Sequence, residues 1–135
     1  MKAVHQTIVN TTNGNCMQAS VASILDLELD QVPKFVEMEG DQWFWGIVSF
    51  MESFGYQYKG YCSDQFNDSF SMSDLQKFIG IDGYFLTSGK SPRFNCGHMT
   101  VYKLEEDGSF NLAHDPHESG SGILDISDVL IFEKN

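Results

Sequence analysis

Two hydrophobic patterns divide this sequence at about Gly83, and their order limits the folds open to it. Upstream of Gly83, apolar residues recur at spacings of three and four, which is typical of helices with one buried face. Downstream, short β-prone runs are separated by glycine-rich or charged turns, which is typical of antiparallel strands. Because the helices precede the strands, the sequence predicts an α+β fold with N-terminal helices packed on a C-terminal antiparallel sheet.

The helical pattern predicts three helices, at residues 16–27, 41–54 and 71–79. Small residues in the first of them permit close packing, so we expect a central buried helix. Pro33 stops any helix before it, so residues 26–33 predict a turn or a short helix. The alternating pattern predicts four strands, at residues 84–87, 98–104, 109–113 and 128–133. Residues 56–69 are polar and aromatic with little periodicity.

Composition limits the class of protein. A chain of 135 residues that is 41% hydrophobic fits one domain, residues 1–135, with one core. The net charge of −11, from 19 acidic and 8 basic side chains, repels nucleic-acid phosphates and anionic lipids, so we expect neither as a partner. The first residues lack the apolar run of a signal peptide, and three cysteines without paired spacing indicate free thiols. We therefore expect a cytoplasmic protein with no membrane span.

A cysteine stands at the expected start of the first helix. Cys16 follows the polar segment 11–15, and a thiol at a helix N-terminus feels unpaired backbone N–H groups and the positive end of the helix dipole. Both favour the thiolate, so Cys16 is the candidate nucleophile, and its own N–H is placed to donate to an oxyanion. The alternative is a buried structural thiol, the usual state of a free cysteine.

A histidine and an aspartate are placed to assist this thiol. His98 opens a predicted strand, and we expect Gly97 before it to leave room for close approach. Asp115 follows the next strand, so a hairpin brings it beside His98, where it can accept from the ring nitrogen that does not face sulfur. His98 is thus the candidate base and Asp115 its orienting group. The alternative for Asp115 is a simple Asp-Pro turn.

Two amides compete to complete an oxyanion hole. Gln6 lies upstream of Cys16 in a segment that can pack beside the helix start, and Asn10 lies closer to Cys16 along the chain. We favour Gln6, and the alternative for either amide is a surface side chain without a role.

A metal site is a competing interpretation. Its ligands would be drawn from His98, Cys96, His114, Asp115 and His117. The chain has no Cys-x-x-Cys spacing, and His114 and Asp115 point to opposite faces of a strand. We therefore expect no metal and no cofactor, and we expect Cys62 and Cys96 to be packing or incidental thiols.

Several short motifs together resemble a known family. They are Gln6-Thr7, Gly14-Asn15-Cys16, Ala22-Ser23-Ile24-Leu25, Leu29-Asp30-Gln31-Val32-Pro33, Gly97-His98 and His114-Asp115-Pro116-His117. The set resembles the papain-like cysteine peptidase superfamily, and is most similar to the small bacteriocin-leader-peptidase-like proteins of bacteria and phages. The resemblance covers both ends of the chain and is weak from about residue 40 to 90. Papain relatives place the glutamine about six residues before the cysteine, where this chain has Asn10.

The resemblance implies a papain-like fold and a division of roles. Cys16 would be the nucleophile, His98 the base, Asp115 the orienting group and Gln6 the oxyanion donor. It implies a thiol hydrolase that forms a thioester with a peptide, protein or small amide substrate, in the host cytoplasm if the protein is phage-encoded. The aromatic run at 43–45 and residues 56–69 would shape the cleft.

Other readings of the sequence stay open. The same site serves a cysteine acyltransferase or deamidase. A papain-like scaffold without activity would be a binding or inhibitor module, and a zinc-binding protein would use His98, His114 and His117.

Overall fold

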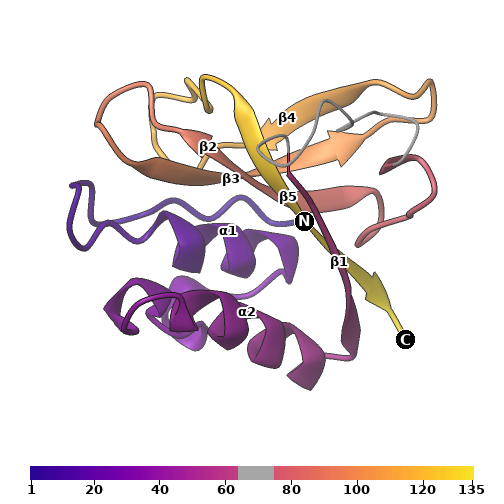
Figure 1. The fold of residues 1–135 in the computed structure, drawn as a ribbon, viewed down its shortest axis with the longest axis horizontal. Helices are drawn as coiled ribbons and strands as arrows, with labels where there is room; N and C mark the ends of the chain where they lie inside the picture. Colours follow the sequence, from indigo (N-terminus) through magenta and orange to yellow (C-terminus); the bar gives the residue numbers. More distant parts are fainter. Residues whose placement is uncertain (64–74) are drawn as a thin grey trace.

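The chain forms an α+β fold, in a computed structural model that describes residues 1–63 and 75–135. The helices are α1 (Cys16–Ile24) and α2 (Gln42–Ser53), with the short 3₁₀ helices η1 (Leu29–Gln31) and η2 (Phe35–Glu37) between them. The strands are β1 (Tyr56–Ser63), β2 (Tyr84–Lys90), β3 (Gly97–Leu104), β4 (Phe110–His114) and β5 (Ile126–Lys134). They form one antiparallel sheet in the order β1-β5-β2-β3-β4 (Figure 1).

The helices begin where the sequence predicts. Helix α1 ends at Ile24, three residues early, because Asp26 adopts a left-handed conformation with φ of 59°, which an α-helix does not accommodate. Helix α2 is followed by Gly55, whose φ of 86° turns the chain into β1. Of the helix predicted at 71–79, residues 71–74 lie outside the described residues, Leu75 is helical, and residues 76–79 are not, so the prediction runs too far at its C-terminal end.

Strand β1 was not predicted, and the absence of a strand at 56–63 is an error of the sequence analysis. Tyr56 and Tyr58 alternate with polar residues and pack against the main core, as a half-buried strand requires. Gly60, with φ of 124°, then shifts the register of β1 on β5. This irregularity interrupts the alternation after Tyr58. The alternating run is therefore too short to be recognised as a strand from the sequence.

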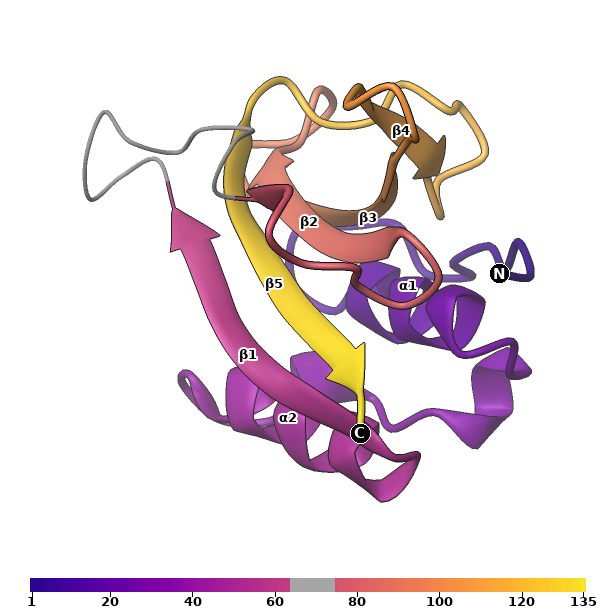
Figure 2. The ribbon, with the colours of Figure 1, turned by 90° about the vertical axis from the view of Figure 1, so that its right-hand side faces the viewer.

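Both helices cover the same face of the sheet (Figure 1). Helix α1 lies against β2 and β3, and α2 lies against β1. Figure 2 shows the long strands β1 and β5 curving side by side past the helices. No helix in the described ranges is long and apolar enough to cross a membrane.

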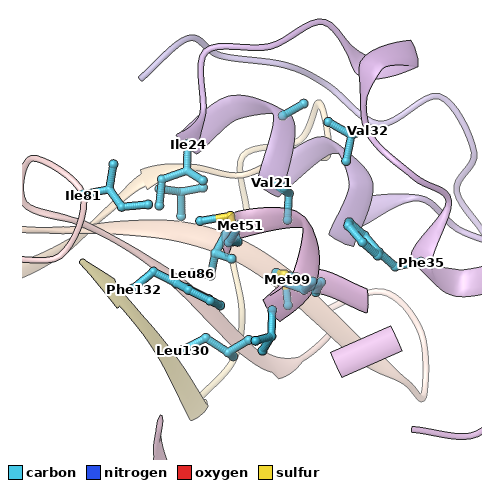
Figure 3. Packing of buried hydrophobic residues seen from close by; sticks show 14 residues of the cluster. Val21, Ile24, Val32, Phe35, Met51, Ile81, Leu86, Met99, Leu130 and Phe132 are labelled. Atoms are coloured by element: carbon cyan, nitrogen blue, oxygen red, sulfur yellow. The ribbon is translucent and has the colours of Figure 1, made fainter. Parts of the chain in front are cut away.

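The main core lies between the helices and this face (Figure 3). Val21 and Ile24 of α1 and Met51 of α2 meet side chains from the sheet, each 4% exposed or less. Their sheet partners include Leu86, Met99, Leu130 and Phe132. A buried side chain of this size contributes roughly 1.5–3 kcal/mol. The core therefore holds the start of α1 in a fixed position over β3.

The opposite face of the sheet carries a second, smaller cluster. Phe85, Val129 and Ile131 alternate with the core residues of β2 and β5 and pack with Leu75. Because successive strand residues point to opposite faces, β2 and β5 are buried on both sides.

The close backbone approach near His98 occurs at Gly89, not at Gly97 as the sequence analysis expected. Gly89 pairs with His98 across β2 and β3, and a Cβ atom there would lie 1.8 Å from the carbonyl oxygen of Asp125. A Cβ atom at Gly97 would meet nothing nearer than the Gly89 carbonyl oxygen, at 3.8 Å. The requirement for glycine arises from the chain entering β5.

We expect Gly89→Ala to destabilise the protein by about 1–3 kcal/mol or more, because the chain near Asp125 must move to admit the methyl group. Gly97→Ala is the matched control, and it should change stability by no more than about 0.5 kcal/mol because its methyl group meets only an ordinary contact. Urea denaturation of both variants measures the difference. Equal stabilities would contradict this account of the β2–β5 contact.

Candidate active site

Helix α1 begins at Cys16, and its first turn is left open by an unusual arrangement of Asn15. Asn15 occupies the position before the helix, where its side chain would normally accept from the first turn. Instead its Oδ1 accepts from the backbone N–H groups of Thr7 and Ile8, both at 2.9 Å, and its Nδ2 donates to Thr7 Oγ1. Within the described part of the chain, no side chain caps α1. The first N–H groups thus stay available near the Cys16 thiol.

Helix α1 is fixed on the strand that carries His98. The buried Ser20 hydroxyl donates to the carbonyl oxygen of Met99 at 3.1 Å, and Met99 directly follows His98. Ser20 lies one helical turn after Cys16, so this bond sets the height of the thiol above β3. The Cys16 side chain consequently lies next to the His98 ring and interacts with it.

His98 and Asp115 form a buried pair. The ring Nε2 of His98 donates to Asp115 Oδ1 at 2.6 Å, and the two residues are each 5% exposed. Asp115 also accepts from the backbone N–H of His117 at 3.0 Å and of Gly122 at 2.7 Å. The hairpin of β3 and β4 brings the two side chains together, since His98 opens β3 and Asp115 follows the end of β4. Three donors therefore fix the carboxylate, and the carboxylate fixes the ring.

The positive charge of His98 and the negative charge of Asp115 stabilise each other. Burial lowers the pKa of His98, but the hydrogen bonds and negative charges of Asp115 and Cys16 outweigh burial and raise it to about 9. Burial raises the pKa of Asp115, yet the hydrogen bonds from His98, His117 and Gly122 bring it below its usual value. At neutral pH the pair is therefore an imidazolium beside a carboxylate.

A cavity of about 290 Å³ opens beside the thiol. Cys16 and His98 form part of its wall, together with the loop 9–14, Trp43 of α2 and the β2–β3 turn. Within the aromatic run at 43–45, Trp43 lines the cavity, Phe44 packs on the core and Trp45 is 55% exposed.

The prediction that residues 56–69 shape the cleft is not supported by the part of this segment that the structure describes. Residues 56–63 form β1 at the far edge of the sheet, and residues 56–60 of this strand do not line the cavity. Residues 64–69 lie outside the described residues.

Both amides proposed for the oxyanion hole reach the cavity, in different environments. Asn10 Oδ1 accepts from the N–H groups of Thr12 and Asn13, at 2.9 and 2.7 Å, and so closes the turn before Cys16. Gln6 Nε2 donates to the Ile8 carbonyl at 2.9 Å, and its Oε1 is buried without a partner among the described residues. The Gln6 backbone is tied to the carbonyl of Pro116, next to Asp115. Asn10 thus shapes the loop, whereas Gln6 stands beside the paired side chains.

The other histidines have separate roles. His114 Nε2 donates to the Val4 carbonyl at 2.7 Å and its ring meets that of His5 edge to face, so it holds the N-terminal segment against β4. His117 Nδ1 accepts from the N–H of Ser119 at 3.0 Å. In residues 1–63 and 75–135, no three His, Cys, Asp or Glu side chains are grouped to hold a metal.

Several residues that shape the site were not predicted from the sequence. Asn15 and Ser20 position Cys16, and Arg93 and Asp128 place charges in the cavity wall. Asn15 stands in the Gly-Asn-Cys motif, which was the only signal for it. Cys96, expected to be a packing or incidental thiol, is partly buried and lines the cavity that also contains Cys16.

No family model matches this chain, and no curated protein or solved structure matches it significantly. The site is therefore interpreted from its own geometry.

The raised pKa of His98 can be observed directly. In NMR spectra we expect the His98 ring to titrate near pH 9, whereas in Asp115→Asn its midpoint should fall, because the strongest hydrogen bond that holds the proton and one of the two negative charges beside it are lost while burial persists. Cys16→Ala should lower the midpoint as well. A midpoint near 6.5 in the unmodified protein, or one unaffected by Asp115→Asn, would contradict the pairing.

Proposed function

We propose that this protein is a thiol-dependent hydrolase of the papain-like superfamily that cleaves a peptide, isopeptide or amide bond. One observation carries the proposal. Cys16 at the start of α1, His98 at the start of β3 and Asp115 after β4 come together beside a cavity of about 290 Å³, although they lie far apart in the sequence. A thiol, an imidazole and a group that orients the imidazole are the components of a cysteine nucleophile site.

The first step of the reaction transfers the acyl group to Cys16. The thiolate attacks the carbonyl carbon of the substrate, a carbon–sulfur bond forms, and the carbonyl electrons move to oxygen. When they return, the carbon–nitrogen bond breaks, and the leaving nitrogen takes the proton from the His98 imidazolium. The products of this step are a free amine and a thioester on Cys16.

The second step releases the acyl group. His98, now neutral, accepts a proton from water as the water oxygen attacks the thioester carbon. The carbon–sulfur bond breaks, so that the carboxylic acid leaves and the thiolate and imidazolium are restored. Asp115 keeps the ring oriented through both steps, since its carboxylate bonds Nε2 and leaves the other ring nitrogen for the sulfur.

Two kinds of donor serve the oxyanion in this proposal. The open first turn of α1 supplies the backbone N–H of Cys16, because Asn15 points away from it. Gln6 supplies a side-chain amide, of which one hydrogen is engaged by Ile8 and the other is available.

The proposal predicts that Cys16 reacts faster than the other thiols at mildly acid pH. At pH 6, iodoacetamide should alkylate Cys16 ahead of Cys62 and Cys96, because Cys16 combines a helix N-terminus with a neighbouring imidazolium. Peptide mapping by mass spectrometry measures the three rates, and urea-unfolded protein is the control in which they should converge. Equal rates in the folded protein would indicate a catalytically idle binding module instead.

A second test separates Gln6 from Asn10. With 4-nitrophenyl acetate, which passes through an oxyanion, Gln6→Ala should slow acylation of Cys16 by roughly 100-fold. Iodoacetamide forms no oxyanion, so alkylation of Cys16 should stay close to that of the unmodified protein. Asn10→Ala should loosen the turn and have little effect on the ratio of the two rates. A large loss of acylation in Asn10→Ala alone would reverse the assignment.

A further inference from the structure

We infer that Arg93 makes this site selective for substrates that carry a carboxylate group. The inference rests on the proposed function, since it concerns what enters the cavity beside Cys16. Arg93 lies in the turn between β2 and β3 and lines the same cavity as Cys16 and His98.

The turn holds Arg93 in a defined place. The Ser91 hydroxyl accepts from the backbone N–H of Arg93 at 3.1 Å and of Phe94 at 3.2 Å, and the Ser91 N–H donates to the Cys96 carbonyl. These bonds close the turn internally. Arg93 therefore lines the cavity from a short, hydrogen-bonded turn that leads directly into β3, the strand that carries His98.

The guanidinium group of Arg93 is held by a hydrogen bond, but no carboxylate among the described residues balances its charge. Its Nη1 donates to the uncharged hydroxyl of Ser119 at 3.1 Å, while its Nε is buried and has no acceptor in the part of the chain that the structure describes. Among the described residues, no carboxylate lies within ion-pair distance of Arg93. A partly buried charge without a carboxylate beside it is unfavourable, and an anion in the cavity would compensate it through the guanidinium N–H groups that remain accessible.

The absence of an acidic partner for Arg93 within the described ranges contrasts with the composition of the chain. The sequence contains 19 acidic side chains and only 8 basic ones. An acidic residue of the cavity wall, Asp128, interacts instead with the hydroxyls of Ser88 and Ser127, both at 3.3 Å. The positive charge of Arg93 is felt nearby, since burial and then Arg93 lower the pKa of His117. The cavity lining thus carries a positive charge at Arg93 and a negative charge at Asp128.

This arrangement fits a substrate with one carboxylate. The planar guanidinium offers parallel N–H donors that match the two oxygens of a carboxylate. Asp128 would repel a second negative charge placed against its own wall. The carboxylate has two sources, an acidic side chain or the C-terminus of a peptide, and both present the same group to Arg93.

Matched alkylating reagents test the inference without a known substrate. N-bromoacetyl-glutamate amide and N-bromoacetyl-glutamine amide differ in a side-chain carboxylate, whereas N-bromoacetyl-glycylglycine and its amide differ in a terminal one. In each case the Cys16 thiolate displaces bromide and a carbon–sulfur bond forms. The quantity measured is the acid-to-amide ratio of the Cys16 labelling rates, obtained by peptide mapping.

We expect the acid-to-amide ratio for at least one pair of reagents to fall about tenfold in Arg93→Gln. The pair that responds identifies the source of the carboxylate. Arg93→Lys should retain part of the preference for the acid reagent, because lysine keeps the positive charge but lacks the paired N–H donors of the guanidinium. Lys90→Gln is the matched control, since it removes an equal charge from an exposed position outside the cavity wall, and it should leave the ratio unchanged.

The outcomes separate this inference from the proposed function. If the neutral reagents label Cys16 no faster than Cys96 in the unmodified protein, the proposed function fails. If Cys16 reacts well but neither ratio responds to Arg93→Gln, or if Lys90→Gln lowers the ratio equally, only the role of Arg93 is overturned. Thermal melting of each variant checks that the fold is kept, and Arg93→Lys carries the test should Arg93→Gln unfold.

Discussion

The hydrogen bond between His98 and Asp115 connects most of the parts on which this site depends. Each of the two charges is buried, and removing one would leave the other uncompensated in a medium of low polarity. The same carboxylate accepts from the backbone of His117 and Gly122. One side chain thereby ties β3 to the loop that follows β4, so the orientation of the base and the shape of that loop are set together.

The thiol side of the site depends on a different set of contacts. A helix of nine residues is too short to be stable alone, so α1 takes its position from its surroundings. Ser20 attaches it to β3, and Asn15 attaches its start to the N-terminal segment. That segment is held in turn by Ser23 of α1 and by His114 of β4. The placement of Cys16 therefore requires an ordered N-terminus.

The sequence was informative where a pattern is local. Periodicity located α1 and α2, and alternation located β2 to β5, so that the β3–β4 hairpin and the meeting of His98 with Asp115 could be predicted. Features set by distant parts of the chain could not be. The requirement for glycine at residue 89 comes from the Asp125 carbonyl, and the lack of an acceptor for Arg93 Nε within the described ranges depends on its neighbours in space. Strand β1 was hidden because Gly60 interrupts its alternation.

The loop from Asp115 to Gly122 has a consequence for how this protein can vary. The Asp115 carboxylate accepts a hydrogen bond from the N–H of Gly122, so the two ends of the loop are joined and the loop forms a hydrogen-bonded ring. Ser119, within this ring, accepts a hydrogen bond from Arg93. Adding or deleting a residue would displace the base, the arginine or both. Relatives with altered selectivity should therefore differ by substitutions in a ring of constant length, and lengthening of the chain around the cavity should be confined to other loops.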